Sequence, residues 1–308
     1  MPRNLALFGA PGTGKSFQLN IIGAKTKDNP NDIFPRESVR RVTVYPDYTY
    51  SQFVGSYRPF TKGDKIGYRY IAGAFLQTYI DASTRPYDNH LPIIEELNRA
   101  NPAAVFSDVF QPLDRNAFRS SEYYVTASME IAACIEEALE LLDDKERKDI
   151  ESYFDADVDF ADFYETMKHT LELPPNMYIQ ATINNADQGV FPVGTAFKRH
   201  WDFRYMGINE GEDATLDALN GAKMSNHTVG ICDCRAIWNE LRKAINMLLL
   251  DNGVNEDKLL GLFPLSPEAL SNEPYGDEDK SHIVSAFEDK VLLYLHEDAG
   301  KMKRKGIF

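Results

Sequence analysis

The feature that most constrains this chain is an octapeptide near its start. Residues 9–16 read Gly-Ala-Pro-Gly-Thr-Gly-Lys-Ser, the spacing G-x-x-x-x-G-K-S of a phosphate-binding loop. In such a loop backbone N–H groups surround phosphates, and glycines stand where a Cβ would block the approach. The apolar run at 5–8 suits a buried parallel strand, and residues 17–24 can continue as a helix. An ordinary glycine turn is the alternative, but this strand–loop–helix context favours a nucleoside triphosphate site.

Each position of this loop has an expected role. We expect Lys15 to reach the β- and γ-phosphates during catalysis and the Ser16 hydroxyl to ligate Mg²⁺. The predicted nucleotide contacts are the whole loop and the residue after it, namely Gly9, Ala10, Pro11, Gly12, Thr13, Gly14, Lys15, Ser16 and Phe17. Only eight residues precede the loop, so we expect one strand and no separate domain before it.

A second apolar run, residues 91–94, ends in two carboxylates, Glu95 and Glu96. If this run is a strand of a parallel sheet, its carboxyl end lies at the edge where α/β folds bind ligands. In P-loop enzymes one such acid holds Mg²⁺, and in many the next activates the attacking water. We predict that Glu95 serves the metal, although aspartate is more usual there, and that Glu96 is the catalytic base. A solvated surface pair is the alternative, and the four apolar residues before it disfavour that interpretation.

Four blocks of sequence resemble the McrB-like, dynein-related group of AAA+ proteins, which includes the motor subunits of modification-dependent restriction systems. The blocks are the tyrosine-rich residues 46–55, Ile-Glu-Glu-Leu-Asn-Arg-Ala-Asn at 94–101, Ala-Thr-Ile-Asn-Asn-Ala-Asp at 181–187 and Thr-Ala-Phe-Lys-Arg-His-Trp at 195–201. They follow the family's order within residues 4–206. The resemblance implies an α/β P-loop NTPase fold, with a parallel sheet flanked by helices and then a small helical lid.

The resemblance also implies roles for residues outside these two motifs. Asn184 takes the sensor position, where its amide would orient the lytic water, and an asparagine capping a strand end is the alternative. Asp187 would hold that loop or a neighbouring arginine. Arg199 is expected to act as an arginine finger on the γ-phosphate of an adjacent subunit. Lys198 is the alternative finger, because the two residues after Arg199 depart from the family's Arg-Phe pair.

Alternating strands and helices predict two parts. Residues 1–206 should form the nucleotide-binding domain, with an acidic helical insertion at about 127–172, and residues 207–308 a linker and helical lid. The tyrosine- and glycine-rich residues 48–70 are expected to form a loop. Within and beside residues 63–74, the aromatic side chains of Tyr68, Tyr70 and Phe75 would pack between subunits or in the core, with presentation to a pore as the alternative. Residues 259–263 stand where a second sensor is expected but contain no arginine.

The charge of the chain bears on its partners. A net charge of −14 argues against a broad nucleic-acid-binding surface, although it leaves room for a local basic patch. Residues 136–162 hold twelve acidic residues against three basic ones, and we expect a solvated face there, with a docking surface for a basic partner as the alternative.

Apolar runs and cysteines bear on its location. The lack of a membrane-length apolar run and of a signal peptide predicts a cytoplasmic protein without a membrane partner. The three cysteines predict neither a disulfide framework nor a metal site.

The sequence therefore predicts a Mg²⁺-dependent NTPase, with ATP favoured over GTP. Its expected partners are further copies of itself, in a ring expected to be a hexamer, and a separate effector or nuclease subunit of a restriction or defence system. DNA would be contacted only indirectly. The alternatives are a nucleotide-gated scaffold that hydrolyses slowly and a protein-remodelling ATPase of the MoxR kind. Phosphate release with and without the product of a neighbouring gene separates a motor from a scaffold.

Overall fold

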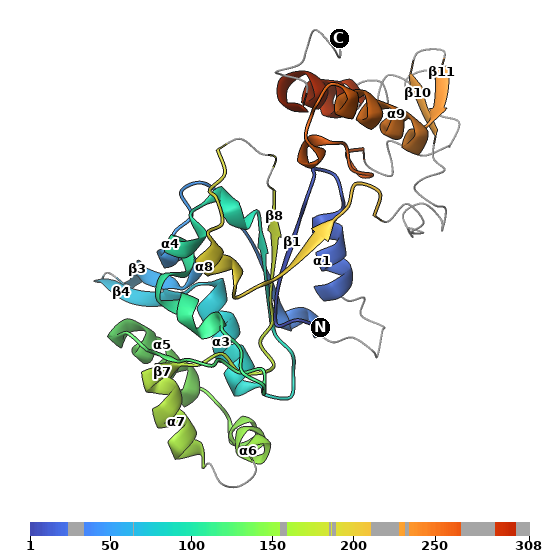
Figure 1. The fold of residues 1–308 in the computed structure, drawn as a ribbon. Coiled ribbons are helices and arrows are strands. Elements are labelled where there is room, and N and C mark those ends of the chain that lie inside the picture. Colours follow the sequence, from blue (N-terminus) through green and yellow to red (C-terminus); the bar gives the residue numbers. More distant parts are fainter. Residues whose placement is uncertain are drawn as a thin grey trace. The chain divides into compact units, whose positions relative to one another are not determined.

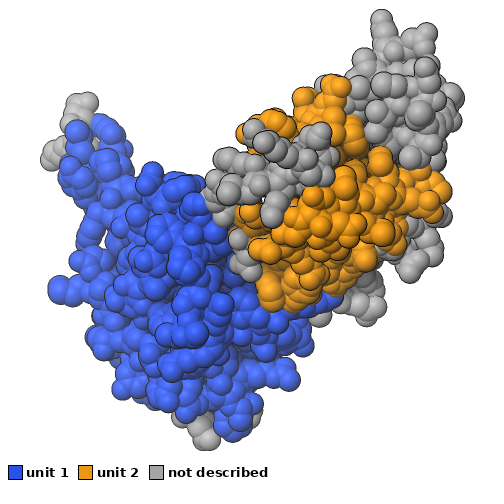
Figure 2. Space-filling model, turned by 45° about the horizontal axis from the view of Figure 1, so that its top comes forward, with its two compact units in different colours: residues 1–7, 16–183, 189–204 blue, residues 8–15, 184–188, 205–308 orange. Residues whose placement is uncertain are grey.

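The structure is a computed structural model, and it describes residues 1–23, 34–63, 65–154, 159–184, 186, 189–210, 228–231, 234–265 and 287–299. Two compact units make up the chain, and Figure 2 colours them separately. Unit 1 comprises residues 1–7, 16–183 and 189–204, and unit 2 comprises residues 8–15, 184–188 and 205–308. The predicted division into an α/β domain and a lid after residue 206 stays a prediction.

A five-stranded parallel sheet lies at the centre of the α/β fold (Figure 1). Its spatial order is β2-β5-β8-β1-β9, and the strands are β1 (Asn4–Gly9), β2 (Val39–Thr43), β5 (Leu91–Glu95), β8 (Ile179–Ile183) and β9 (Asp202–Met206). β5 pairs in parallel with β2 on one side and with β8 on the other. Every residue of β5 and β8 is buried, as expected for inner strands of a sheet covered by helices. The predicted P-loop NTPase fold is confirmed.

Helices and short turns connect these strands. They are α1 (Lys15–Gly23), α2 (Tyr50–Phe53), α3 (Ala74–Thr84), α4 (Pro102–Phe106) and α8 (Thr195–Lys198), with the 3₁₀ turns η1 (Arg36–Ser38), η2 (Leu97–Arg99) and η3 (Ser107–Leu113). Between η3 and β8 stand α5 (Met129–Glu140), α6 (Asp144–Tyr153) and α7 (Phe160–His169), enclosed by the antiparallel strands β6 (Val125–Thr126) and β7 (Thr170–Leu171). Three helices thus occupy the segment where an acidic helical insertion is predicted.

The described C-terminal elements belong to unit 2. They are the antiparallel pair β10 (Thr228–Ile231) and β11 (Cys234–Ile237), α9 (Trp238–Asp251), the 3₁₀ turn η6 (Glu256–Lys258), and the π turns η8 (Glu288–Leu292) and η9 (Leu295–Ala299). Helix α9 begins at Trp238, because the residues directly before it pair as strand β11. Among the described residues, no helix combines the length and apolarity that a membrane crossing requires.

The loop predicted for residues 48–70 is wrong. The segment contains α2 and an antiparallel hairpin of β3 (Gly55–Lys62) and β4 (Lys65–Ala72). Among the described residues of the hairpin, Gly63 supplies the turn, with a φ of 62°. Gly67 lies inside a strand beneath the ring of Phe60, where a Cβ would come within 2.9 Å of ring carbons. Glycines read as loop signals therefore mark a turn at one position and close packing within a strand at another.

An aromatic cluster holds the helices of unit 1 together. Phe106, at the end of α4, is fully buried and contacts Phe53 of α2, Phe75 of α3 and Phe197 of α8. The ring of Trp201 lies 6.0 Å from that of Phe106. The Phe106 side chain of α4 therefore packs against three further helices from separate parts of the sequence.

We expect Phe106→Ala to lower the free energy of unfolding of the chain by about 3–5 kcal/mol, because it leaves a cavity among these rings. The matched control is Phe118→Ala, since Phe118 is 83% exposed, and its effect should stay within about 0.5 kcal/mol. Urea unfolding followed by fluorescence measures both. Equal stability of the two variants would show that the cluster does not hold unit 1 together.

Candidate functional site

The predicted phosphate-binding loop forms a tight turn between β1 and α1. Gly12 and Gly14 have φ angles of 71° and 82°, in the left-handed region that glycine enters without steric cost. The Thr13 hydroxyl donates a hydrogen bond to the carbonyl oxygen of Ala10 at 2.9 Å, which closes the turn from within. The spacing of glycines in the sequence therefore follows from the backbone conformation that the turn requires.

Lys15 lies inside this turn. Its side chain is only 7% exposed, and its Nζ donates hydrogen bonds to the carbonyl oxygens of Gly9 and Ala10, each at 2.9 Å. These backbone acceptors hold the ammonium group within the loop, next to the backbone that the sequence assigns to phosphate binding. A cation in this position suits an anionic ligand of the loop.

A second segment of unit 2 contacts the same loop through its backbone. The Gly261 N–H donates to the Pro11 carbonyl at 3.1 Å, and the Phe263 N–H donates to the Gly12 carbonyl at 2.7 Å. A Cβ on Gly261 would stand 2.3 Å from the carbonyl carbon of Gly12. Residues 259–263, which the sequence shows to lack a sensor arginine, thus contact the loop through main-chain hydrogen bonds.

Helix α9 fixes this segment in turn. The Trp238 indole N–H donates to the Leu262 carbonyl at 3.0 Å, and Arg242 Nη1 donates to the Leu260 carbonyl at 3.0 Å. Arg242 is fully buried, and its guanidinium also bonds the side chain of Asn239. The sequence reasoning missed this arginine because its contacts reach eighteen residues along the chain.

The two predicted metal ligands, Ser16 and Glu95, lie together in unit 1. Glu95 ends β5 and is 8% exposed, and its Oε2 accepts hydrogen bonds from Ser16 Oγ at 2.9 Å and Thr182 Oγ1 at 2.7 Å. Its Oε1 pairs with the guanidinium of Arg41, from β2. Hydroxyl and carboxylate oxygens are the hard donors that Mg²⁺ prefers, so this donor set fits the predicted metal.

Glu96, the predicted base, has an unusual backbone. Its φ of 59° and ψ of 42° lie in the left-handed region, which non-glycine residues enter rarely. Its N–H donates to Thr182 Oγ1 at 2.9 Å, and its carboxylate accepts a hydrogen bond from Arg99 Nε at 3.3 Å. Strained positions of this kind cluster at functional sites, and the adjacent strand holds this one in place through Thr182.

Asn184, the predicted sensor, directly follows the last residue of β8 and is half-buried. Since β8 is the parallel neighbour of β5, the strand that ends at Glu95, the carboxyl ends of the two strands lie at one edge of the sheet. Asp187, with its expected supporting role, lies outside the described residues.

Arg199, the predicted finger, follows α8 and exposes 62% of its side chain. Its Nε–H donates to His200 Nε2 at 3.2 Å, and its guanidinium lies 3.8 Å from the Asp114 carboxylate. The His200 ring is buried against Phe110, and its Nδ1 lies 2.5 Å from Asp114 Oδ1. Because Nε2 accepts from Arg199, Nδ1 carries the proton that bonds Asp114. Lys198, the alternative finger, is also exposed.

The sequence analysis did not single out several residues of this arrangement. Thr182 lies inside a predicted motif but was assigned no role. Its hydroxyl, on the strand next to Glu95 and Glu96, could have indicated a hydrogen-bond donor to those acids. Arg41 and Asp114 gave no such signal, because each lies in a stretch of ordinary polarity and meets its partner only through the fold. Their contacts are with Glu95 and His200, respectively.

Comparison with known proteins identifies relatives. Residues 4–200 match the AAA domain family, dynein-related subfamily. The chain is 36% identical to the type II restriction enzyme BsuMI component YdiS of Bacillus subtilis, over 98% of this chain and 80% of that protein. It is 26% identical to the type IV methyl-directed restriction enzyme EcoKMcrB subunit of Escherichia coli, over 68% of this chain and 36% of that protein.

A solved structure from Cytophaga hutchinsonii aligns with 80% of this chain and 59% of its own, at 16% identity and a TM-score of 0.29. So distant a likeness carries no argument about the site.

The contact of residues 259–263 with the loop leads to a prediction. Gly261→Ala places a methyl group against Gly12 and must displace the loop, so we expect ATP to bind at least about tenfold more weakly, since 1.4 kcal/mol of misfit already gives that factor. Gly207→Ala is the matched control, because its Cβ meets nothing within 4 Å. Titration with a fluorescent ATP analogue measures both variants, and equal affinities would contradict the expected displacement.

Proposed function

Since the chain belongs to the dynein-related subfamily of AAA domains and is McrB-like, we propose that it is a Mg²⁺-dependent ATPase that assembles into a ring and drives or gates an effector subunit. The observation that carries this proposal is a pair of hydrogen bonds to the buried carboxylate of Glu95. One comes from Ser16, the last residue of the phosphate-binding loop, and the other from Thr182. An acid so placed, next to the hydroxyl that follows the loop lysine, is the arrangement used for Mg²⁺-nucleotide binding in P-loop enzymes.

We assign binding roles as follows. The backbone of residues 9–16, together with Phe17, holds the triphosphate, and Lys15 leaves the loop carbonyls to contact its β- and γ-oxygens. Ser16 and Glu95 would hold Mg²⁺, which when bound neutralises charge on the phosphates. Arg41 neutralises the Glu95 carboxylate in the arrangement that the structure shows. We further propose that residues 207–308 act as the lid.

We assign the hydrolytic step to residues that directly follow strands β5 and β8. A water oxygen attacks the γ-phosphorus, the bond to the β,γ-bridging oxygen breaks, and the proton of the water passes to the Glu96 carboxylate. Arg99 orients that carboxylate by its hydrogen bond. We propose that Asn184 positions the attacking water and that Arg199 of one subunit stabilises the charge on the γ-phosphate of its neighbour. The exposure of Arg199, together with its anchoring by Asp114 and His200, supports a role across a subunit boundary.

The nucleotide and the partners are finer points of the proposal. We propose ATP because the AAA class generally uses it, and GTP is the competing nucleotide to be tested beside it. Both restriction relatives are named as parts of a larger enzyme, one as a component and one as a subunit. We therefore propose a hexameric ring that acts on a separate nuclease-bearing subunit.

The ATPase assignment is tested by two substitutions. We expect Lys15→Ala to abolish ATP binding, because the loop loses its buried cation, and Glu96→Gln to bind ATP while turnover falls by about 10²–10⁴-fold. Glu37→Gln, at an exposed glutamate, is the control. Titration calorimetry and steady-state phosphate release measure binding and turnover. Normal phosphate release by Glu96→Gln would remove Glu96 from the role of base.

The ring is tested by mixing subunits. Arg199→Ala should lower turnover by about 10³-fold or more, as for other fingers supplied in trans. Mixing it with Lys15→Ala should restore activity, since random assembly pairs an intact loop with an intact finger at about a quarter of the sites. Lys198→Ala is the control for the neighbouring cation. Absence of recovery at every mixing ratio would argue against a finger supplied by another subunit.

A further inference from the structure

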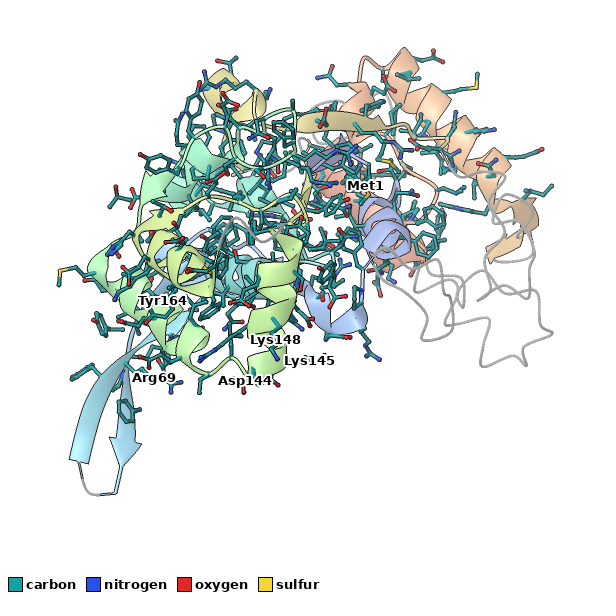
Figure 3. The ribbon with its side chains drawn as sticks, turned by 90° about the horizontal axis from the view of Figure 1, so that it is seen from below. Met1, Arg69, Asp144, Lys145, Lys148 and Tyr164 are labelled. Carbon is teal, nitrogen blue, oxygen red and sulfur yellow. The ribbon has the colours of Figure 1, made fainter. Side chains whose placement is uncertain are left out.

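The β3–β4 hairpin extends away from the rest of unit 1 (Figures 1 and 3). Each strand has eight residues, and the two strands pair with each other along their whole length. Several large side chains of this hairpin are exposed to solvent, among them Tyr57 (58%), Phe60 (43%), Ile66 (73%) and Tyr68 (71%). Neither the nucleotide site nor the core of unit 1 uses them.

The register gives the hairpin two different faces. Directly paired residues share a face, and faces alternate along each strand. One face carries Tyr57 opposite Tyr70, with ring centroids 5.7 Å apart, and Pro59 opposite Tyr68. The opposite register positions pair Arg58 with Arg69, Phe60 with Gly67 and Lys62 with Lys65. The hairpin therefore has an aromatic face and a cationic face, with Phe60 at the middle of the cationic one.

The cationic face costs folding energy. Like charges directly opposite each other destabilise a sheet, and a two-stranded hairpin has little stability to lose. Arg69 has an acid within reach, Glu137 of α5 at 4.0 Å, but both side chains are more than half exposed. Exposed pairs of this kind contribute little. The facing Arg58 and Arg69 therefore favour an anionic ligand from outside the hairpin.

The spacing indicates the kind of anion. Arg58 and Lys62 stand four residues apart on one strand, which is about 13 Å at about 3.3 Å per residue. A polymer with regularly repeated negative charges can contact two cations at this separation. A nucleic-acid strand is such a polymer, because it presents one phosphate per about 3.4 Å along its axis. Phe60 lies between the two cationic pairs, and aromatic rings among cations are the usual platform for unpaired bases. An acidic peptide would match the cations but offers no base to stack on Phe60.

We propose that the cationic face of the β3–β4 hairpin binds single-stranded nucleic acid directly, with phosphates contacting the paired Arg58 and Arg69 and a base stacking on Phe60. The hairpin, residues 55–72, carries four basic residues and one acidic residue in a chain of net charge −14. The general acidity of the chain therefore does not describe this surface. The proposal does not depend on nucleotide hydrolysis, and it departs from the expectation of indirect DNA contact alone.

Fluorescence anisotropy with a labelled oligothymidylate of about sixteen nucleotides, long enough for one site, tests the proposal on the full chain at low salt without nucleotide. The double variant Arg58→Gln/Arg69→Gln should bind at least about tenfold more weakly, and the slope of log affinity against log salt should fall by about 0.7 per lost phosphate contact. Arg36→Gln/Lys148→Gln removes two exposed cations elsewhere and should leave affinity within about twofold of the parent.

Phe60→Leu separates stacking from charge. Leucine keeps an apolar side chain over Gly67, so the hairpin should stay folded, while affinity for the oligonucleotide falls about tenfold with an unchanged salt slope. Thermal unfolding checks that each variant is folded. The Lys15→Ala background should bind the oligonucleotide like the parent, which keeps this test independent of the ATPase assignment.

Three results would overturn the proposal. The first is absence of oligonucleotide binding by the parent at low salt. The second is undiminished binding by the folded Arg58→Gln/Arg69→Gln variant. The third is equal competition by polyglutamate together with normal binding by Phe60→Leu, which would identify the face as a site for acidic protein segments instead. Duplex DNA of the same length should compete less well than the single strand, because its bases are already stacked.

Discussion

A buried carboxylate is the constraint on which the rest of this structure depends. Glu95 is 8% exposed, and an ionised group in such a place requires partners, because desolvation otherwise costs more than the fold can supply. Its partners, Ser16, Thr182 and Arg41, come from α1, β8 and β2. The carboxylate is satisfied only when β5 lies between its two parallel neighbours and the first helix begins beside it. The strand order that satisfies the Glu95 carboxylate is therefore the same strand order that assembles the candidate metal site.

Backbone hydrogen bonds and a buried imidazole fix the two cations on which the proposed chemistry depends. Lys15 is held by two carbonyls of its own loop, and neighbouring carbonyls of that loop accept from Gly261 and Phe263. Arg199 is exposed, yet its direction is set by His200, which is itself held by Asp114. For Arg199 this orientation lowers the entropy that must be lost when a phosphate is contacted. Lys15, in contrast, must exchange its two carbonyl acceptors for phosphate oxygens.

The sequence predicts those parts of the site whose geometry is local. The loop at 9–16 and the apolar run that ends at Glu95 are each recognisable within eight residues, because the turn and the strand are set by neighbours in the chain. Contacts between distant segments gave no such signal. Asp114 and His200 are 86 residues apart, and Gly261 reaches the loop from the other end of the chain. The β3–β4 hairpin was missed for another reason: glycine marks turns in general, whereas Gly67 is required by the ring above it.

Acidic and basic residues are distributed unevenly in this chain, so its net charge does not describe every part of its surface. The acidic excess is concentrated in and around α5, α6 and α7, whereas the hairpin is basic. Each hairpin strand has eight residues and so reaches about 27 Å at about 3.4 Å per residue, well beyond the screening length of about 8 Å in physiological salt. The base of the hairpin stays within that length of α5, since Arg69 lies 4.0 Å from Glu137 of that helix, so only the outer part of the hairpin is beyond its reach. A polyanion approaching unit 1 is repelled by the acidic helices and attracted by the hairpin, so uneven charge would direct it to one surface.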